Sequence, residues 1–256
     1  MFKKGVIHFY LGMIPALLIG REGSTGFPGK NVSDILGRPL CWYPMKAAQE
    51  SEFVDATYVS TDFDEIMRIG REIGVNVIER DPELATSDAS SKDAFKDGYE
   101  AIRSRENEEI EAIVLLFCNS PTMTAELIDE AIQALREDVD IDSVVPVSKY
   151  NMRSPVRAHK IEDDRLVPFI DPENIEGAST DRDTQADTYF GDCSFFVVRP
   201  RCFNFENGRP PFPWIGTEVR PLENWGGLDI DFEWQVPQAR YWLRENGFTE
   251  NTTPYN

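Results

Sequence analysis

Residues 14–31 have the sequence IPALLIGREGSTGFPGKN, a short apolar run followed by a loop with three glycines. The run at residues 14–19 predicts a buried strand. Arg21 and Lys30 bracket the loop, whose glycines allow several backbone N–H groups to face one anion. Because open α/β sheets bind ligands just after a parallel strand, the loop is interpreted as a phosphate site, with an ordinary surface loop as the alternative. It has neither the P-loop spacing nor the dinucleotide-binding fingerprint.

Outward from this loop, short apolar runs alternate with helical patterns. Strands are predicted at residues 14–19, 56–60, 75–78, 112–117, 143–147, 193–198 and 228–230, and helices at residues 40–51, 62–73, 91–105, 125–136 and 232–245. This alternation predicts an α/β protein whose mostly parallel sheet is covered by helices on both faces. Residues 1–256 are interpreted as one domain, in which a polar, proline-containing stretch at about 150–192 is an inserted arm or lid.

The composition excludes several classes of protein. A net charge of −19 over 256 residues disfavours nonspecific nucleic-acid binding, which needs a basic surface. Four cysteines and two histidines without paired spacing argue against a zinc site or a disulfide framework and favour a reducing, cytoplasmic setting. No stretch approaches the roughly 18 apolar residues of a membrane span. His8, Gly12 and Pro15 interrupt the apolar N-terminal run, which we therefore expect to be a strand and not a signal peptide.

Two carboxylates, Asp229 and Asp231, lie one residue apart between apolar neighbours. On an extended strand both would point to the same face. Two hard oxygen ligands beside a triphosphate suit Mg²⁺ with its water shell. The structural alternative is that Asp231 caps the helix that follows and Asp229 occupies a turn.

Taken together, these segments resemble the acylneuraminate cytidylyltransferase family, the CMP-sialic-acid synthetases, with the CMP-Kdo synthetases as more distant relatives. The resemblance runs from about Ala16 to the closing helix. It is carried by the loop at 21–31, by YVSTD at 58–62, by RDPELA at 80–85 with ASS at 89–91, and by LDID at 228–231. It implies a three-layer, Rossmann-like nucleotidyltransferase fold and an enzyme that uses CTP and Mg²⁺.

The resemblance also implies a role for each matched position. Arg21 and Lys30 would hold the CTP phosphates with the backbone N–H groups of Gly23, Ser24 and Gly26, Asn31 would contact the ribose or phosphate region, Arg80, Ala89 and Ser91 would read the cytosine edge, and Asp229 and Asp231 would hold Mg²⁺. An acceptor oxygen would then attack the α-phosphorus of CTP and release pyrophosphate. For Arg80 the alternative is an exposed charge, and for residues 89–91 it is a cap of the next helix.

The acceptor is less constrained, because the chain departs from the family there. The family's Leu-Gln-Pro-Thr-Ser-Pro-Leu-Arg stretch corresponds to LFCNSPTM at 116–123, and its Asn-Gly pair in the sugar pocket corresponds to Asp192 and Cys193. A small acid is expected, either a nonulosonic sugar acid or a phosphonate or other acidic metabolite. Candidates for binding its negative charge are Arg153, Arg157, Lys160 and Arg182, with solvated surface charges as the alternative.

Two functions from other classes are compatible with the same fold. A uridylyl- or guanylyltransferase is disfavoured by the segment at 80–91, which resembles a cytosine-reading segment. A non-catalytic nucleotide sensor is disfavoured because both Asp229 and Asp231 are retained beside the loop at 21–31. The resemblance further implies a homodimer built through the arm.

Overall fold

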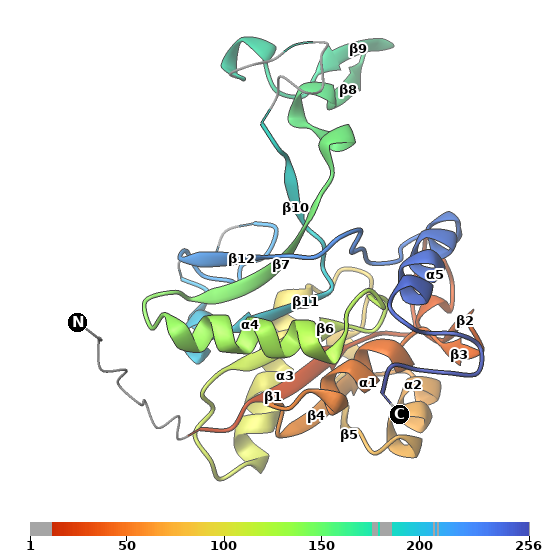
Figure 1. Ribbon diagram of the computed structural model, residues 1–256, viewed down its shortest axis with the longest axis vertical. Coiled ribbons are helices and arrows are strands. Elements are labelled where there is room, and N and C mark those ends of the chain that lie inside the picture. Colours follow the sequence, from red (N-terminus) through yellow and green to blue (C-terminus); the bar gives the residue numbers. More distant parts are fainter. Residues whose placement is uncertain (1–11, 176–178, 180–185, 207, 209, 256) are drawn as a thin grey trace.

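The computed structural model describes residues 12–175, 179, 186–206, 208 and 210–255. Eight of the described strands form one sheet (Figure 1). They are β1 (Pro15–Ile19), β4 (Ala56–Thr61), β5 (Asn76–Glu79), β6 (Ile113–Phe117), β7 (Ser143–Lys149), β10 (Tyr189–Gly191), β11 (Phe195–Val198) and β12 (Val219–Glu223). The helices are α1 (Trp42–Glu50), α2 (Asp64–Glu72), α3 (Ser91–Arg105), α4 (Ala125–Glu137) and α5 (Val236–Glu245), and β2 (Asp34–Ile35) and β3 (Arg38–Pro39) form a small separate pair.

The sheet is parallel on one side and mixed on the other. Strands β5, β4, β1 and β6 are parallel neighbours in that order. Strand β11 then runs antiparallel between β6 and β7, while β12 pairs with β7 in parallel and β10 pairs with it antiparallel. The carboxyl ends of the parallel strands therefore meet at the edge where β11 begins.

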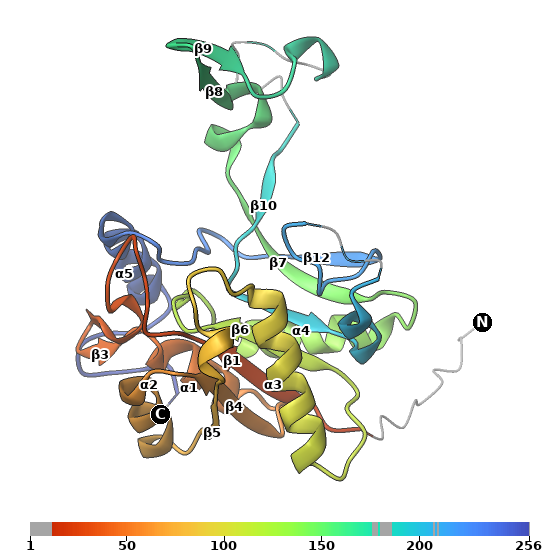
Figure 2. The ribbon, with the colours of Figure 1, turned by 180° about the vertical axis from the view of Figure 1, so that it is seen from behind.

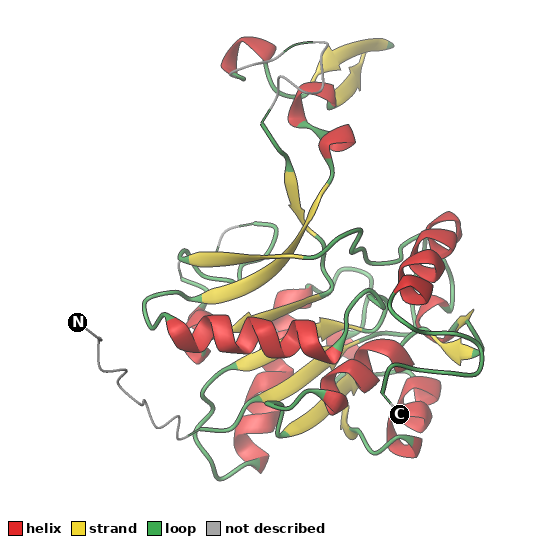
Figure 3. Ribbon diagram, viewed as in Figure 1, coloured by secondary structure: helices red, strands yellow, loops and turns green. Residues whose placement is uncertain are grey.

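Alternate residues of the central strands face two different helix layers. On β1, Ala16 and Leu18 pack in the core cluster that contains residues of α1, α2 and α4, whereas Leu17 and Ile19 pack in the cluster that contains α3. Successive side chains of a strand point to opposite faces, so a continuous apolar run is buried on both sides. Figures 2 and 3 show α3 and α4 on opposite sides of the sheet. The predicted three-layer fold with a mostly parallel sheet is confirmed.

Most predicted elements are confirmed to within a few residues, with two exceptions. The strand predicted at residues 228–230 is wrong, because that segment pairs with the loop after β6 and not with a strand. Strand β12 was not predicted, since Pro221 and two charged residues, Arg220 and Glu223, obscure its apolar pattern at an edge of the sheet. The closing helix begins with a short 3-10 turn at Glu233–Gln235 before α5.

The chain between β7 and β10 leaves the body as a projecting arm (Figures 1 and 2). Its described part carries the hairpin of β8 (His159–Glu162) and β9 (Arg165–Pro168). The pairing of β7 with β10 forms the stalk. Several large apolar side chains of the arm are exposed, among them Ile161, Leu166 and Phe169.

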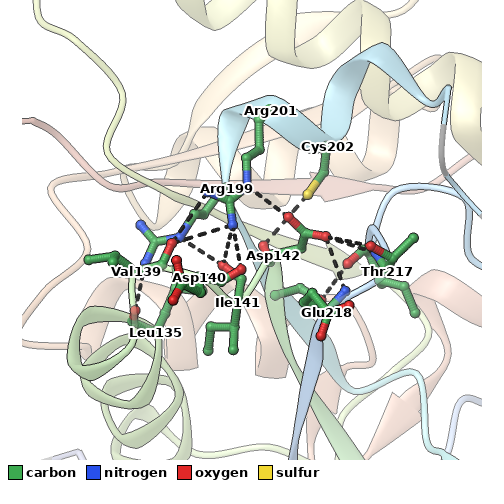
Figure 4. Close-up of polar contacts among 12 residues, drawn as sticks. Leu135, Val139, Asp140, Ile141, Asp142, Arg199, Arg201, Cys202, Thr217 and Glu218 are labelled. Atoms are coloured by element: carbon green, nitrogen blue, oxygen red, sulfur yellow. Dashed lines mark hydrogen bonds and ion pairs between the residues drawn. The ribbon is translucent and has the colours of Figure 1, made fainter.

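At the end of β7 away from the arm, a polar cluster fastens the loop after α4 to the end of β11 (Figure 4). Arg199 donates to the Leu135 carbonyl at 2.7 Å, near the C-terminus of α4. Arg201 pairs with Asp142 at 2.7 Å, and the Asp142 carboxylate accepts from the Thr217 backbone N–H at 2.8 Å. Cationic side chains thus satisfy helix-end carbonyls and fix the entry to β12.

A third apolar cluster places α5 against the N-terminal part of the chain. Trp242 and Leu243 of α5 pack with Leu40 and Tyr43, and Leu228 and Ile230 belong to the same cluster. Residues 1–11, which include His8 of the N-terminal run, lie outside the described residues. In the part of the chain that is described, none of the helices has both the length and the apolar character that crossing a membrane requires.

Candidate active site

A cavity of about 870 Å³ opens where the carboxyl ends of β1 and β6 meet. All of the residues predicted to bind CTP or the metal line it, namely Arg21, Gly23, Ser24, Gly26, Lys30, Asn31, Arg80, Ala89, Ser91, Asp229 and Asp231. They come from the loop after β1, the end of β5, the start of α3 and the segment before α5. The structure therefore brings them together in one place, while their individual roles stay predictions.

A hydrogen bond joins the two ends of the loop after β1, and the loop packs closely against the segment that contains Asp229 and Asp231, called here the aspartate segment. The Asn31 side-chain amide donates to the Arg21 carbonyl at 3.0 Å, and Asn31 Oδ1 is buried without a partner among the described residues. A Cβ at Gly26 would lie 2.8 Å from the Asp231 carbonyl oxygen, so only glycine permits this approach. Beside Gly23, by contrast, no protein atom would lie within 4 Å of such a Cβ. The loop thus offers open space and an unpaired acceptor to a ligand.

Arg80 is only 5% exposed, which rules out the alternative of an exposed charge. Its Nε donates to Ser60 Oγ at 3.2 Å, and a second guanidinium nitrogen donates to the Ser60 carbonyl. Burial lowers the pKa of Arg80 from its ordinary value. These bonds hold the Arg80 guanidinium beside the cavity, close to the start of α3. The guanidinium has hydrogen-bond donors and no acceptor.

The start of α3 serves both the helix and the cavity. Ser90 caps α3, because its Oγ accepts from the Asp93 backbone N–H at 3.1 Å. Its neighbours Ala89 and Ser91 line the cavity. The alternative interpretation of residues 89–91 as a helix cap therefore holds for Ser90, which lies between the two residues that line the cavity.

The paired aspartates line the cavity although they do not belong to a sheet. Lys30 Nζ lies 2.6 Å from Asp231 Oδ1. Asp231 does not cap the following helix: the backbone N–H groups of Asp231 and Phe232 both donate to Gln235 Oε1 at 2.8 Å. Burial, followed by the negative charge of Asp231, raises the pKa of Asp229. The two carboxylates repel each other, and Lys30 compensates their charge only in part.

This donor set fits Mg²⁺. Two hard carboxylates lie beside a cavity that also presents Arg21 and Lys30. Burial, followed by the charge of Asp231, raises the pKa of Asp229, and a divalent cation would stabilise both carboxylates in their charged form. Among the described residues, no group of three or more histidine, cysteine, aspartate or glutamate side chains makes a complete metal site. The remaining ligands would be phosphate oxygens and water, which is how proteins usually hold Mg²⁺.

Two pairs of hydrogen bonds hold the aspartate segment to the loop after β6. The Ile230 N–H donates to the Asn119 carbonyl at 2.9 Å, and the Asn119 side-chain amide donates to the Ile230 carbonyl at 3.0 Å. Thr122 Oγ1 donates to the Leu228 carbonyl at 3.0 Å and accepts from the Leu228 N–H at 2.9 Å. Both flanks of Asp229 are thereby fixed, which positions its carboxylate.

Asp192 lies outside the cavity wall, although its place in the family pattern suggested the acceptor pocket. Its carboxylate accepts from Ser148 Oγ, from the Asn224 side-chain amide and from the Ser194 backbone N–H, each at 3.0 Å. Burial raises the pKa of Asp192. The Gly227 N–H also donates to Ser148 Oγ, at 2.9 Å. This buried network joins β7, the start of β11 and the segment that leads into the paired aspartates.

Sequence analysis missed one side of the cavity. Its lining includes Lys92, Phe117, Asn119, Cys193, Phe212 and Trp214. Phe117, Asn119 and Cys193 stood out only within departures from a family pattern, and the available signal for Phe212 and Trp214 was the run PPFPW at 210–214. Burial, followed by the charge of Asp229, raises the pKa of the Cys193 thiol well above its usual range, so the thiol stays neutral.

Three of the cationic residues expected to bind the acceptor do not line the cavity of their own chain. Arg153 and Arg157 lie in short turns after β7, and Lys160 on β8 pairs with Glu162 at 2.7 Å. The fourth, Arg182, lies outside the described residues.

Comparisons of the sequence with known proteins point in one direction. The family model described as "Cytidylyltransferase" matches residues 13–187. The N-acylneuraminate cytidylyltransferase B of Danio rerio is 30% identical over 227 residues, which cover 88% of this chain and 50% of that protein. The 3-deoxy-manno-octulosonate cytidylyltransferase of Bdellovibrio bacteriovorus is 30% identical over 147 residues, covering 56% of this chain and 54% of that protein. The chain spans about half the length of these curated relatives.

A comparison of structures supports the fold. A CMP:2-keto-3-deoxy-manno-octonic acid synthetase complexed with CTP superimposes with a TM-score of 0.64, covering 91% of this chain and 99% of that one. The two sequences are 15% identical, so the likeness shows a shared architecture. A 4-diphosphocytidyl-2C-methyl-D-erythritol synthase matches with a TM-score of 0.61 at 12% identity.

Proposed function

This chain belongs to the cytidylyltransferase family, and from that premise we propose that it transfers CMP from CTP to an oxygen of a small acidic acceptor. One observation carries the proposal: a glycine-rich loop with two cations, a buried arginine and a pair of carboxylates converge on one cavity. Relatives are named for N-acylneuraminate and for 3-deoxy-manno-octulosonate. A nonulosonic, sialic-acid-like sugar is therefore the first acceptor class, and a phosphonate is its competitor in the test below.

In the proposed reaction, the acceptor oxygen bonds to the α-phosphorus of CTP and gives its proton to solvent. The bond from that phosphorus to the oxygen bridging the β-phosphate breaks, and pyrophosphate leaves. Arg21 and Lys30 bind phosphate oxygens and neutralise the charge that builds on the leaving group. The ion pair of Lys30 with Asp231 holds the ammonium group in place for this contact. Catalysis thus rests mainly on positioning and charge neutralisation.

We propose that Asp229 and Asp231 hold the Mg²⁺ that this reaction needs. When bound, the ion supplies charge neutralisation to the phosphate oxygens. The hydrogen bonds of Asn119 and Thr122 to residues 228 and 230 fix both carboxylates before the substrate arrives. We also place the reaction in the cytoplasm, since the four cysteines are free thiols, as in reducing compartments.

The base preference is the first test. CTP with Mg²⁺ is expected to raise the melting temperature more than UTP or GTP does, because Arg80 and the start of α3 form a fixed surface for the base. A ligand that binds only the native state stabilises it by mass action, and each kcal/mol shifts the melting temperature by about 2–4 °C in a domain of this size. Thermal shift at matched nucleotide concentrations gives the order.

Pyrophosphate release is the matching activity measurement. Each nucleotide is incubated with Mg²⁺ and a panel of sugar acids, phosphonates and neutral sugars. Release that requires both CTP and an acid supports the proposal. Equal thermal shifts for all three nucleotides would contradict the base-reading assignment, and turnover with neutral sugars alone would contradict the acidic acceptor.

We further propose that the chain forms a homodimer through its arm. Three apolar side chains of the arm are exposed, namely Ile161 at 77%, Leu166 at 70% and Phe169 at 66%. Ile161 and Leu166 lie on the hairpin of β8 and β9, and Phe169 directly follows β9. Apolar side chains gathered on a projection are typical of a contact surface. Such a dimer would also be the means by which Arg157 reaches an acceptor bound to the partner.

The substitution Leu166→Glu is expected to convert a dimer into a monomer, since a desolvated carboxylate without a partner opposes association. Light scattering after gel filtration measures the mass directly. Val139→Glu is the matched control, because Val139 is also exposed, at 55%, but lies on the body. A monomeric wild type, or a dimer that survives Leu166→Glu, would contradict a dimer through this surface.

A further inference from the structure

The lining of the cavity includes two groups of residues that differ in chemistry. One group carries charged and hydrogen-bonding side chains, namely Arg21, Lys30, Arg80 and Ser91. The other consists of aromatic rings and prolines, contributed by Phe117, Pro210, Pro211, Phe212, Pro213 and Trp214. This second group is called the aromatic wall.

The aromatic wall is a packed, preformed surface. The Trp214 ring lies 5.1 Å from Phe95, 5.6 Å from Phe196 and 5.7 Å from Phe212, measured between ring centroids. Phe117 lies 5.3 Å from Phe95 and 6.3 Å from Trp214. Phe95 and Phe196 are fully buried, whereas Phe117 and Phe212 are half-buried. Edge-on and tilted contacts of this kind restrain the rings, so the half-buried pair cannot turn away to admit polar groups.

The position of the aromatic wall in the sheet makes it the acceptor end. The phosphate loop follows β1, and Arg80 follows β5 on one side of that strand. Phe117 ends β6, which neighbours β1 on the other side. Two residues later, Asn119 bonds to Ile230, which lies between the paired aspartates. The base therefore lies on one side of the reacting phosphate, and the aromatic wall lies on the other, next to the carboxylates.

The aromatic wall has few groups with which to hydrogen-bond an acceptor. The Trp214 N–H is itself buried and has no partner among the described residues, and the phenylalanine and proline side chains have neither donor nor acceptor. A hydroxyl pressed against this surface would lose its bond to water without replacement. A methyl or methylene group would instead gain apolar contact.

We propose that the aromatic wall selects acids in which one face carries methyl or methylene groups where common sugar acids carry hydroxyls. This inference rests on the proposed CMP transfer and names its acceptor more narrowly. The preferred acceptor is an acid with a hydroxyl-poor face, and a fully hydroxylated sugar acid is a poor substrate.

The test compares matched acceptors with the wild-type protein. The probes are N-acetylneuraminic acid and analogues in which one side-chain hydroxyl at a time is replaced by hydrogen. At least one deoxy analogue is expected to show a kcat/KM about 10- to 100-fold above that of the parent acid, the range over which an apolar pocket discriminates against an added hydroxyl. Pyrophosphate release with saturating CTP and Mg²⁺ gives both constants.

A pair of variants assigns the preference to the aromatic wall. Phe117→Gln places an amide there and is expected to bring the ratio of deoxy to parent acid towards one, mainly through KM. Phe117→Leu keeps the surface apolar and should retain the ratio. Phe212→Gln is the second polar variant if Phe117→Gln proves unstable, with melting temperatures as the check on folding.

The outcomes separate this inference from the proposed function. If every analogue is used as well as or less well than the parent acid, the inference is wrong while CMP transfer stands. If the preference exists but neither glutamine variant changes it, the aromatic wall does not cause it and the inference is again wrong. If no acid is turned over although CTP and Mg²⁺ stabilise the protein, the proposed function is wrong, and the inference that rests on it is wrong as well.

Discussion

Replacing Asp229 with asparagine is expected to lower kcat by about 100- to 10,000-fold while the fold persists. The variant removes a negative charge from the pair that we propose to hold Mg²⁺, and charge neutralisation by a metal is worth several kcal/mol in the transition state. The pKa of Asp229 is already raised by burial and by Asp231, so the neutral side chain costs the fold little. Pyrophosphate release at saturating CTP and acceptor measures the effect.

The metal assignment also has a readout without turnover. Mg²⁺ is expected to enlarge the thermal shift that CTP produces in the wild type and to add nothing in Asp229→Asn, because the two carboxylates would hold the ion together with phosphate oxygens of CTP. The control is Asp140→Asn, an exposed aspartate outside the cavity. Near-normal kcat at saturating Mg²⁺ in the variant would show that Asp229 is not a metal ligand.

Asn224→Ala is expected to lower the free energy of unfolding by about 2–4 kcal/mol and to reduce kcat as well. Asn224 is buried, and its amide donates to the Asp192 carboxylate at 3.0 Å and to the Thr122 carbonyl at 3.1 Å. Truncation leaves two buried acceptors short of a partner, one of them charged, which is costly. The turnover falls because this network supports the segment that ends in Asp229. Urea unfolding and steady-state kinetics measure the two effects.

The loss in Asn224→Ala should depend on pH. Burial raises the pKa of Asp192, so the folded state holds a proton on this group more readily than the unfolded state does. For such a group, stability rises as pH falls from the folded pKa towards the unfolded one. The amide of Asn224 favours the carboxylate, and its removal raises the pKa of Asp192 further. The destabilisation is therefore largest near neutral pH and shrinks as pH falls through that window.

A matched asparagine separates this effect from a generic loss. Asn76 is exposed, and its amide donates to the Thr57 carbonyl at 3.3 Å, with no carboxylate in the contact. Asn76→Ala should cost about 1 kcal/mol or less, independently of pH. A destabilisation by Asn224→Ala that stays constant across the acidic range would refute the role assigned to the Asp192 charge.

Much of the nucleotide side of the cavity could be predicted from the sequence. Its residues belong to short contiguous patterns: a strand with a glycine loop, an arginine just after β5, and the first residues of α3. In a parallel sheet the carboxyl ends of neighbouring strands meet at one edge, so residues that follow such strands converge. Asp229 and Asp231 line the cavity as well, although the sequence analysis assigned them to an extended strand that does not exist.

The acceptor side could not be predicted in this way. Asp192 and Cys193 are neighbours in the chain, yet one is buried in a polar network and the other lines the cavity, because Cys193 has a left-handed backbone conformation with φ of 57°. Trp214 reaches the cavity through packing against Phe95 and Phe196, residues far from it in the sequence. Neither periodicity nor spacing reports such contacts.

The sequence by itself determined the alternation of strands and helices, the glycine-rich loop after β1 and the pairing of the two carboxylates, since these follow from local patterns of apolar residues, glycines and charges. The tertiary structure alone decided which groups surround the carboxylates. It anchored residues 228–230 to the loop after β6, assembled the aromatic wall and kept Arg157 outside the cavity of its own chain. The physical reason is that these features depend on side-chain packing and hydrogen bonds between distant segments, whose partners are set only when the layers close around one core.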